Sequence, residues 1–281
     1  MGLRIVTGVV LIAAVVALVL WAPAWAVAIG AAAVALLAMI EFFALGERLG
    51  LRPFREWTLI CAAALYYAQY TMGLVETRAF GGVVLSRSFG ATISIDVVLI
   101  AFLFGCAVII LATRRPLQDV LPAISISSAG LLFIGLPFSY LVRINEIPRD
   151  GGALALFTLA LVWAGDTLAY FTGKFLGRVP MAPALSPKKT WEGAVANLIG
   201  SLIVGWVAAR WIDIAPGTLL FIAAIANIAG QMGDLIESAY KRGAAVKDSG
   251  TIVPGHGGAL DRIDSLILAA PVVWFLWIAL R

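Results

Sequence analysis

The residues best suited to chemistry lie in one stretch near the C-terminus, from Gly233 to Asp264. Acidic and basic side chains are interspersed there with glycines, and the stretch holds the only histidine of the chain, His256. It lies between two segments that are hydrophobic enough to cross a membrane. Ionisable groups held at the edge of hydrocarbon are costly and indicate a functional site by default. The pattern predicts a site that handles phosphate and metal.

Two carboxylates in this stretch are the best candidates for a metal site. Asp234 stands near the end of one apolar segment and Asp261 just before the next, so a loop that folds back would bring both to one depth. Two carboxylates that share a few oxygens with substrate phosphates are a usual way to hold Mg²⁺, which keeps several of its waters. The alternative is a set of ion-paired loop acids, for example Asp264 with Lys241. The many interspersed charges of both signs favour the magnesium site.

His256 stands between Gly255 and Gly257, where the backbone turns sharply or approaches a ligand closely. It fits three roles equally well: a general base, a donor to phosphate, or a residue that fastens the loop. No cysteine or histidine stands at zinc spacing from it, which argues against a zinc site. The two cysteines, Cys61 and Cys106, lie inside apolar segments and are predicted core residues.

A second charged block, residues 185–193, comes directly before another apolar segment. Its hydroxyl groups suit helix capping, its proline suits the first turn of a helix, and its lysines add positive charge where backbone N–H groups are free. These residues are Ser186, Pro187, Lys188, Lys189 and Thr190. A helix start of this kind is a ready anion site. The alternative is a positive anchor at the membrane surface beside Trp191.

Two further acids lie within apolar segments. Asp166 shares a helix face with Tyr170, four residues further on. A hydrogen bond to a neighbouring helix and a functional role fit Asp166 equally. Glu41 is the one acid well inside an apolar segment of the N-terminal half. We expect a structural role for Glu41, in a pair with Arg48 near the helix end.

Nine apolar segments must position these groups. The chain of 281 residues is 62% hydrophobic and 13% charged, with a mean hydropathy of +1.00, which excludes an ordinary soluble domain. About 20 apolar residues cross a bilayer core as a helix. We predict an all-α fold, a polytopic integral membrane bundle of about nine transmembrane helices. They lie near residues 3–21, 23–45, 57–75, 95–113, 121–142, 152–172, 191–211, 217–236 and 263–280.

The distribution of Lys and Arg predicts the orientation of these segments. If the N-terminus lies in the cytoplasm, 14 of the 20 Lys and Arg residues fall on the cytoplasmic side. The two longest loops on that side, 173–190 and 237–262, are also the most charged. We therefore expect residues 1–150 to form a scaffold of transmembrane helices. Residues 151–281 would form the catalytic region, within one continuous membrane domain.

The charged stretch resembles the signature of a known enzyme family, the phosphatidate cytidylyltransferases, also called CDP-diacylglycerol synthases. The matching residues are SAYKR at 238–242, Lys247-Asp248 and PGHGGALDRID at 254–264, with GDL at 233–235 and SPKKTWEG at 186–193. The resemblance covers roughly residues 160 to 281. Four residues depart from the family pattern without removing a charge: Leu168, Tyr240, Val253 and Ala259.

This resemblance implies transfer of a cytidylyl group from CTP to phosphatidate, which forms CDP-diacylglycerol and pyrophosphate for phospholipid synthesis. It implies a multi-pass enzyme in the inner (plasma) membrane of the cell, with an active site that faces the cytoplasm. It also implies a homodimer within the lipid bilayer. No nucleic-acid partner is expected.

The resemblance also implies which residues do the work. Mg²⁺ would be the cofactor, held by Asp234 and Asp261. Asp166, Asp248 and Asp264 would lie around these ligands or be weaker candidates for metal binding. The other catalytic residues would be Lys241, Arg242 and His256. Substrate binding would fall to Ser186, Lys188, Lys189, Thr190, Lys247, Asp248, Arg262 and Asp264.

Two other classes of function remain open at this point. A CTP-dependent lipid kinase, or another lipid cytidylyltransferase, would use similar groups to bind phosphate and metal. A transporter would spread ionisable residues through the membrane, accessible from both sides. Here the ionisable residues gather on one side and in loops, which favours the enzyme.

Overall fold

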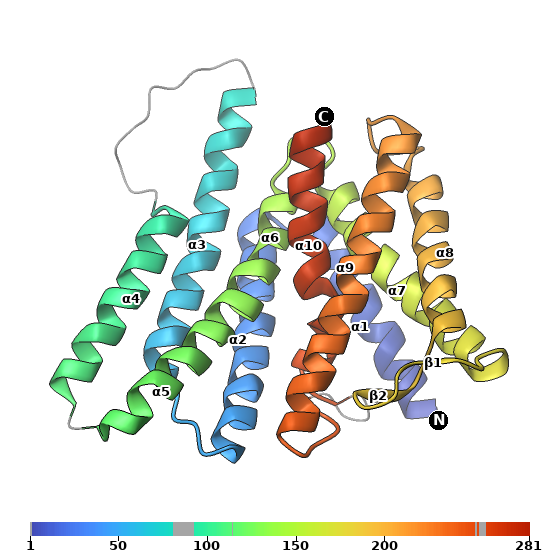
Figure 1. The fold of residues 1–281 in the computed structure, drawn as a ribbon. Coiled ribbons are helices and arrows are strands. Elements are labelled where there is room, and N and C mark those ends of the chain that lie inside the picture. Colours follow the sequence, from blue (N-terminus) through green and yellow to red (C-terminus); the bar gives the residue numbers. More distant parts are fainter. Residues whose placement is uncertain (1, 81–92, 114, 251, 253–256) are drawn as a thin grey trace. The chain divides into compact units, whose positions relative to one another are not determined.

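The computed structural model describes residues 2–80, 93–113, 115–250, 252 and 257–281. Within these ranges the regular structure is almost entirely helical, and two short strands form an antiparallel hairpin. Figure 1 shows the elements. In chain order they are α1 (Gly2–Trp21), α2 (Ala24–Arg48), α3 (Arg55–Phe80), α4 (Ile95–Ala112), α5 (Leu117–Ala129), the π-helical turn η1 (Gly130–Gly135), α6 (Leu136–Asn145), α7 (Gly151–Phe175), β1 (Pro180–Ala182), β2 (Ser186–Thr190), α8 (Trp191–Ala208), α9 (Pro216–Gly243) and α10 (Leu260–Leu280).

Each of the nine predicted apolar segments is helical in the structure, apart from at most three residues at an end. The fifth is a continuous helical run through α5, η1 and α6. Among the described residues, seven helical segments are long and apolar enough to cross a membrane. The other two predicted spans, α1 and α3, are helical, and α1 contributes a shorter apolar part, Val10–Trp21. The predicted class, an all-α multi-pass membrane protein, is confirmed.

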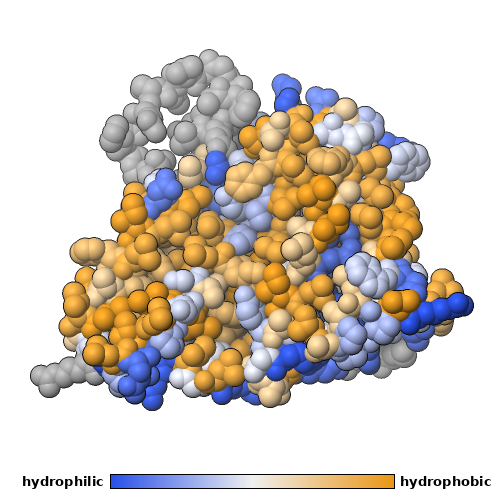
Figure 2. Space-filling model, viewed as in Figure 1, coloured by the Kyte–Doolittle hydropathy of each residue, from blue (hydrophilic) through white to orange (hydrophobic). Residues whose placement is uncertain are grey.

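Hydrophobic side chains cover most of the surface that Figure 2 shows. Large side chains such as Leu111 and Leu117 are 87% and 88% exposed. Water makes such exposure costly, whereas the hydrocarbon of a bilayer does not. The helices also satisfy their backbone hydrogen bonds internally, as a membrane requires. The surface is therefore that of a protein surrounded by lipid.

The chain divides into two compact units. Unit 1 comprises Met1–Arg149 together with Asp248–Arg262, and unit 2 comprises Asp150–Lys247 together with Ile263–Arg281. The described residues just before α10, and the first residues of α10 itself, thus belong to the same unit as the N-terminal helices.

Unit 1 is organised around α2, which packs against α3, η1 and α6. Hydrogen bonds between elements of unit 1 fix the positions of its helices along one another. Ser127 Oγ accepts a hydrogen bond from the backbone N–H of Phe54 at 2.8 Å, and Gln69 Nε2 donates to Ser139 Oγ at 3.1 Å. Both bonds join residues about 70 positions apart, and the groups are buried. Polar bonds of this kind hold helices together where the surroundings are apolar.

Unit 2 depends on close approaches between helices at small residues. A Cβ at Gly200 of α8 would lie 3.0 Å from the carbonyl oxygen of Ala164 in α7, so a larger residue would push the two helices apart slightly. A Cβ at Gly233 of α9 would lie 2.5 Å from the carbonyl oxygen of Asp264 in α10. Small residues at such crossings let backbones pack directly. At Gly233 the consequence is that the acidic ends of α9 and α10 meet.

The predicted boundary of the eighth span is wrong in one respect. The sequence predicts a loop from residue 237, but α9 continues to Gly243. The reason is that Glu237 and Lys241, four residues apart on the helix, form an ion pair and are both buried. Spacing of four supports a helix. Lys241 and Arg242 are therefore in the last turn of α9.

Candidate active site

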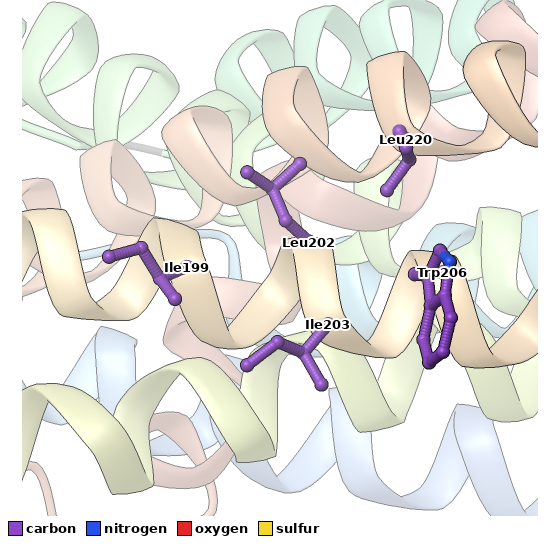
Figure 3. A pocket seen from close by; sticks show the side chains of 5 residues that line it. All are labelled: Ile199, Leu202, Ile203, Trp206 and Leu220. Atoms are coloured by element: carbon purple, nitrogen blue, oxygen red, sulfur yellow. The ribbon is translucent and has the colours of Figure 1, made fainter.

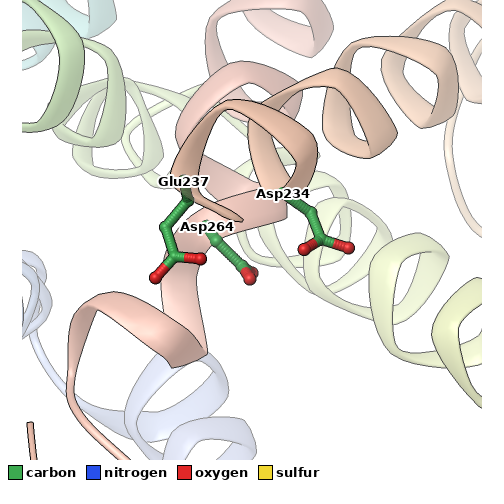
Figure 4. Close-up of side chains that lie close together, drawn as sticks. All are labelled: Asp234, Glu237 and Asp264. Carbon is green, nitrogen blue, oxygen red and sulfur yellow. The ribbon is translucent and has the colours of Figure 1, made fainter. Parts of the chain in front are cut away.

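Three carboxylates converge in unit 2. Asp234 and Glu237 extend from α9 and Asp264 extends from α10, and one oxygen of each lies within 4.8 Å of the others (Figure 4). The close approach of the two helices at Gly233 places these side chains together. Asp234 was predicted as a metal ligand and Asp264 as a substrate-binding residue. Glu237 was not singled out, although its place one turn after Asp234 on a continued helix is the signal that could have found it.

Two lysines neutralise part of this acidic cluster. Lys189 of β2 is ion-paired with Asp234 Oδ2, and these side chains are 26% and 29% exposed. Lys241 Nζ lies 2.5 Å from Glu237 Oε2, and the Glu237 side chain is fully buried. Like charges at this separation repel unless cations balance them. Counted as ionised, the three acids exceed the two lysines by one negative charge.

A series of hydrogen bonds between polar side chains starts at Asp166 and joins three helices, α7, α8 and α9. Asn197 Nδ2 of α8 donates to Asp166 Oδ1 of α7 at 3.1 Å. Asn227 Nδ2 of α9 donates to Asn197 Oδ1 at 2.5 Å and lies 2.6 Å from Ser201 Oγ. Gln231 Nε2 in turn donates to Asn227 Oδ1 at 2.7 Å. The hydrogen bond from a neighbouring helix, one of the two interpretations of Asp166, is present.

The side-chain amides in this hydrogen-bonded series, Asn197, Asn227 and Gln231, were not singled out from the sequence. Asn197 and Asn227 are buried inside apolar helices, and polar groups in such places need partners. That rarity is the signal that could have found them. Tyr170, predicted on the same face as Asp166, is 62% exposed. Its ring packs edge-on against that of Phe171, with 5.4 Å between the ring centroids.

The block before α8 forms the β1–β2 hairpin and brings its lysines to the site. Thr190 caps α8, as predicted, because its side chain accepts the N–H of Gly193 at 3.2 Å. The capping role predicted for Ser186 and the helical position predicted for Pro187 are wrong. Both residues lie in β2, because Ser186 pairs with Ala182 across the hairpin.

The remaining predicted cations differ in their surroundings. Lys188 is exposed on β2, beside the ion-paired Lys189. Arg242 Nε donates to the carbonyl oxygen of Leu185 at 3.1 Å, and its Nη1 donates to that of Val246 at 2.8 Å. Arg242 therefore ties the end of the hairpin to the end of α9. Lys247, Asp248 and Arg262 are exposed.

Asp261 belongs to unit 1 and has a defined set of donors there. Its Oδ2 accepts hydrogen bonds from the N–H and Oγ of Ser249, each at 3.0 Å, and from the N–H of Gly258 at 2.8 Å. Asp234 belongs to unit 2, so the predicted sharing of one metal by Asp234 and Asp261 stays a prediction. His256 lies outside the described residues, and its role stays open.

An apolar hollow of about 340 Å³ lies on another part of unit 2, lined by Ile199, Leu202, Ile203, Trp206 and Leu220 (Figure 3). These residues belong to α8 and α9. Almost none of the lining is polar, so the hollow offers no group for acid–base or metal chemistry. It is suited to hydrocarbon.

A multi-pass helical protein that gathers carboxylates and lysines at the ends of its helices has the groups required for phosphate chemistry at a membrane. The chain belongs to the cytidylyltransferase family, whose sequence profile matches residues 2–280.

Similar proteins carry the name phosphatidate cytidylyltransferase. The one from Staphylococcus saprophyticus is 44% identical over 151 residues, which are 53% of this chain and 57% of that protein. The one from Bacillus subtilis is 38% identical over 147 residues, 52% of this chain and 55% of that protein. These two matches thus span little more than half of the relatives' lengths. The match to the protein from Brucella abortus is 35% identical over 235 residues and covers 80% of both chains.

Proposed function

We propose that the protein transfers a cytidylyl group from CTP to phosphatidate, forming CDP-diacylglycerol and pyrophosphate for phospholipid synthesis. The observation that carries this proposal is the acidic cluster paired with Lys189 and Lys241, in a chain whose whole length matches the cytidylyltransferase family. The relatives named phosphatidate cytidylyltransferase support the choice of substrates. The apolar hollow on α8 and α9 suits the hydrocarbon part of a lipid.

The chemistry asks for positioning and charge neutralisation. A phosphate oxygen of phosphatidate attacks the α-phosphorus of CTP, and the bond from that phosphorus to the oxygen of the β-phosphate breaks. The electron pair leaves with pyrophosphate. The nucleophile is already an anion, so no residue has to remove a proton from it. The protein must instead hold two anions together and stabilise the charge that develops on the leaving group.

The lysines of the site can supply part of that stabilisation. Lys189 lies on a hairpin beside the cluster and is partly exposed, so it can exchange Asp234 for a phosphate oxygen. Lys241 is buried and ion-paired with Glu237, so the position of its ammonium group is fixed. An ammonium group of this kind binds phosphate as a point charge. Ser186, Lys188, Arg242, Lys247 and Arg262 remain candidate contacts for CTP or the lipid headgroup.

Mg²⁺ is the cofactor we propose for this site. The donors of Asp234, Glu237 and Asp264 are all carboxylate oxygens, the ligand type that Mg²⁺ prefers, and no soft ligand competes among these three. These three residues therefore fit the ion. Asp261 stays a candidate ligand because of the family resemblance. When bound, the ion neutralises phosphate charge.

The proposed setting is the cytoplasmic face of the bacterial plasma membrane. The orientation in which 14 of the 20 Lys and Arg residues face the cytoplasm supports it. CTP is supplied from the same side. A homodimer is proposed as well, and the mass of the purified protein in detergent, measured by light scattering, tests it.

The test is an assay with the purified full-length protein, CTP labelled at its α-phosphate, phosphatidate and Mg²⁺. Appearance of label in CDP-lipid, with release of pyrophosphate, supports the proposal. Release of labelled CDP together with a phosphorylated lipid would establish a lipid kinase instead. No turnover with phosphatidate, but turnover with another phosphorylated lipid, would establish a different lipid cytidylyltransferase.

A further inference from the structure

Glu41 of α2 holds the loop that leads into α10. Its Oε1 accepts the N–H of Ala259 at 3.0 Å, and its Oε2 accepts the N–H of Leu260 at 2.9 Å and the hydroxyl of Ser249 at 2.8 Å. The residue is only 5% exposed. The two backbone donors lie 218 and 219 positions further along the chain, so tertiary structure alone creates this contact.

Ser249 connects Glu41 with Asp261. The Ser249 hydroxyl lies 2.8 Å from Glu41 Oε2 and 3.0 Å from Asp261 Oδ2, and its backbone N–H also donates to Asp261 Oδ2. A hydroxyl has one hydrogen to donate, so it serves one carboxylate at a time. The backbone N–H of Ser249 and that of Gly258 then remain as donors to Asp261. The orientation of Asp261 thus depends on a loop whose backbone Glu41 holds.

The glycines of the loop show how closely Glu41 approaches its backbone. A Cβ at Gly258 would collide with Glu41 Oε2 and with Ser249 Oγ. A Cβ at Gly250 would collide with Glu41 Oε1. Both positions are glycine because the carboxylate occupies the space that a side chain would need.

The position of the carboxylate is favourable for two physical reasons. The first N–H groups of a helix have no partner within it, and Glu41 accepts the one of Leu260, at which α10 begins. The positive end of the helix dipole also favours a carboxylate there. Hydrogen bonds from backbone N–H groups to an ionised acceptor are stronger than neutral ones. Glu41 therefore fixes the start of α10, from which Asp261 extends.

We propose that Glu41 is a positioning residue for Asp261: it holds Ser249, Ala259 and Leu260 so that the Asp261 carboxylate keeps one orientation as a metal ligand. This inference depends on the proposed function, in which Asp261 is a metal ligand. Residues that orient ligands in this way are worth about 10- to 100-fold in metal affinity or activity when they are replaced. The structural role expected for Glu41 is therefore the positioning of Asp261. Its hydrogen-bond partners are Ser249, Ala259 and Leu260, and not the expected Arg48.

The experiment compares Glu41→Gln with Glu47→Gln in the full-length protein. Glu47 lies on the same helix, but its side chain is 47% exposed, and its Oε1 lies 3.9 Å from Nη1 of Arg55 in an ion pair. The first readout is hydrogen–deuterium exchange without metal or CTP. We expect faster exchange in the peptide that contains Ala259 and Leu260 in Glu41→Gln, and unchanged exchange in Glu47→Gln. The second readout is binding of Mn²⁺, an EPR-visible substitute for Mg²⁺, which should weaken about tenfold in Glu41→Gln only.

A second variant covers the case in which Glu41→Gln does not fold. Ser249→Ala keeps the two backbone bonds to Glu41, from Ala259 and Leu260. It removes only the hydroxyl between the carboxylates. It should weaken Mn²⁺ binding measurably but less than Glu41→Gln does, since the backbone bonds remain. Normal Mn²⁺ affinity in the folded variants overturns the inference, even if exchange becomes faster, because Glu41 would then only brace the loop.

The failure of this inference is distinguishable from failure of the proposed function. Neither exchange nor Mn²⁺ binding requires turnover. If the unsubstituted protein binds Mn²⁺ but makes no CDP-lipid, the activity is wrong while the two readouts still decide the role of Glu41. If it makes CDP-lipid and Glu41→Gln binds Mn²⁺ normally, the activity stands and the role of Glu41 is refuted.

Discussion

Lys189 and Asp234 form an ion pair that joins the β1–β2 hairpin to α9. The two residues had been predicted for different tasks, phosphate binding and metal binding. In the structure, Lys189, the predicted phosphate-binding cation, neutralises Asp234, the predicted metal ligand. Binding of CTP with Mg²⁺ would replace both halves of the pair, because the phosphate attracts the lysine and the metal attracts the carboxylate.

The first prediction concerns this pair. Lys189→Ala should lower kcat/KM about a hundredfold, since one charged group aimed at a developing charge is worth 10²- to 10³-fold in rate. Lys188→Ala, at the neighbouring exposed position of β2, should cost less than tenfold, because an exposed charge is screened by solvent. Steady-state kinetics with CTP and phosphatidate measure both losses. Equal losses at the two positions would show that the ion pair does not mark the important lysine.

A second prediction concerns the repulsion among the three acids. Asp264→Asn keeps Oδ1, which accepts the N–H of Ser265 at 2.7 Å, and removes one negative charge from the cluster. We expect the unfolding free energy without Mg²⁺ to rise by about 1 kcal/mol, while activity falls about a hundredfold. Thermal unfolding in detergent and the CDP-lipid assay measure the two changes. A variant that is both less stable and fully active would refute the metal assignment of Asp264.

A third prediction concerns the buried pair of Glu237 and Lys241. Lys241→Met leaves the fully buried Glu237 carboxylate without its ammonium partner, so it should lower stability by about 3 to 5 kcal/mol. The double variant Glu237→Gln with Lys241→Met leaves no buried charge at this place and should recover most of that loss. Denaturant titration of the unsubstituted protein, the two single variants Glu237→Gln and Lys241→Met, and the double variant measures the coupling. Additive losses would mean that the pair does not act as a unit.

A fourth prediction concerns the crossing of α9 and α10. Gly233→Ala introduces a Cβ that would lie 2.5 Å from the carbonyl oxygen of Asp264, so the two helices must separate. We expect a loss of about 1 to 3 kcal/mol in stability, together with weaker Mn²⁺ binding, because Asp234 moves away from Asp264. Gly243→Ala, where a Cβ meets nothing within 4 Å, serves as the control on the same helix. Loss of metal binding in the control would point to the helix backbone as the cause.

The sequence by itself was enough for the membrane class and for the approximate helices. Apolar runs of about 20 residues identify spans without knowledge of their neighbours, because each must satisfy the same bilayer thickness. All nine segments are helical in the structure, apart from at most three residues at an end. The charged motifs at 186–193 and 233–264 also indicated the family that the comparison then showed.

Local patterns failed where a distant partner decided the outcome. The end of α9 was placed seven residues too early, since a charged turn at 237–243 reads as a loop until Glu237 and Lys241 are seen to be buried together. Ser186 was assigned to a helix cap, but pairing with Ala182 places it in a strand.

Tertiary structure alone decided which acids share a place. Asp234 lies beside Asp264 because Gly233 has no side chain to keep the two helices apart. Glu41 can accept hydrogen bonds from the residues before and at the start of α10 because Gly250 and Gly258, more than 200 residues away, leave room for its carboxylate. Residue type and spacing show which groups can react, because chemistry and hydrophobicity are properties of single residues and short segments. Which of them meet is set by where backbones can touch, and that is a property of packed helices.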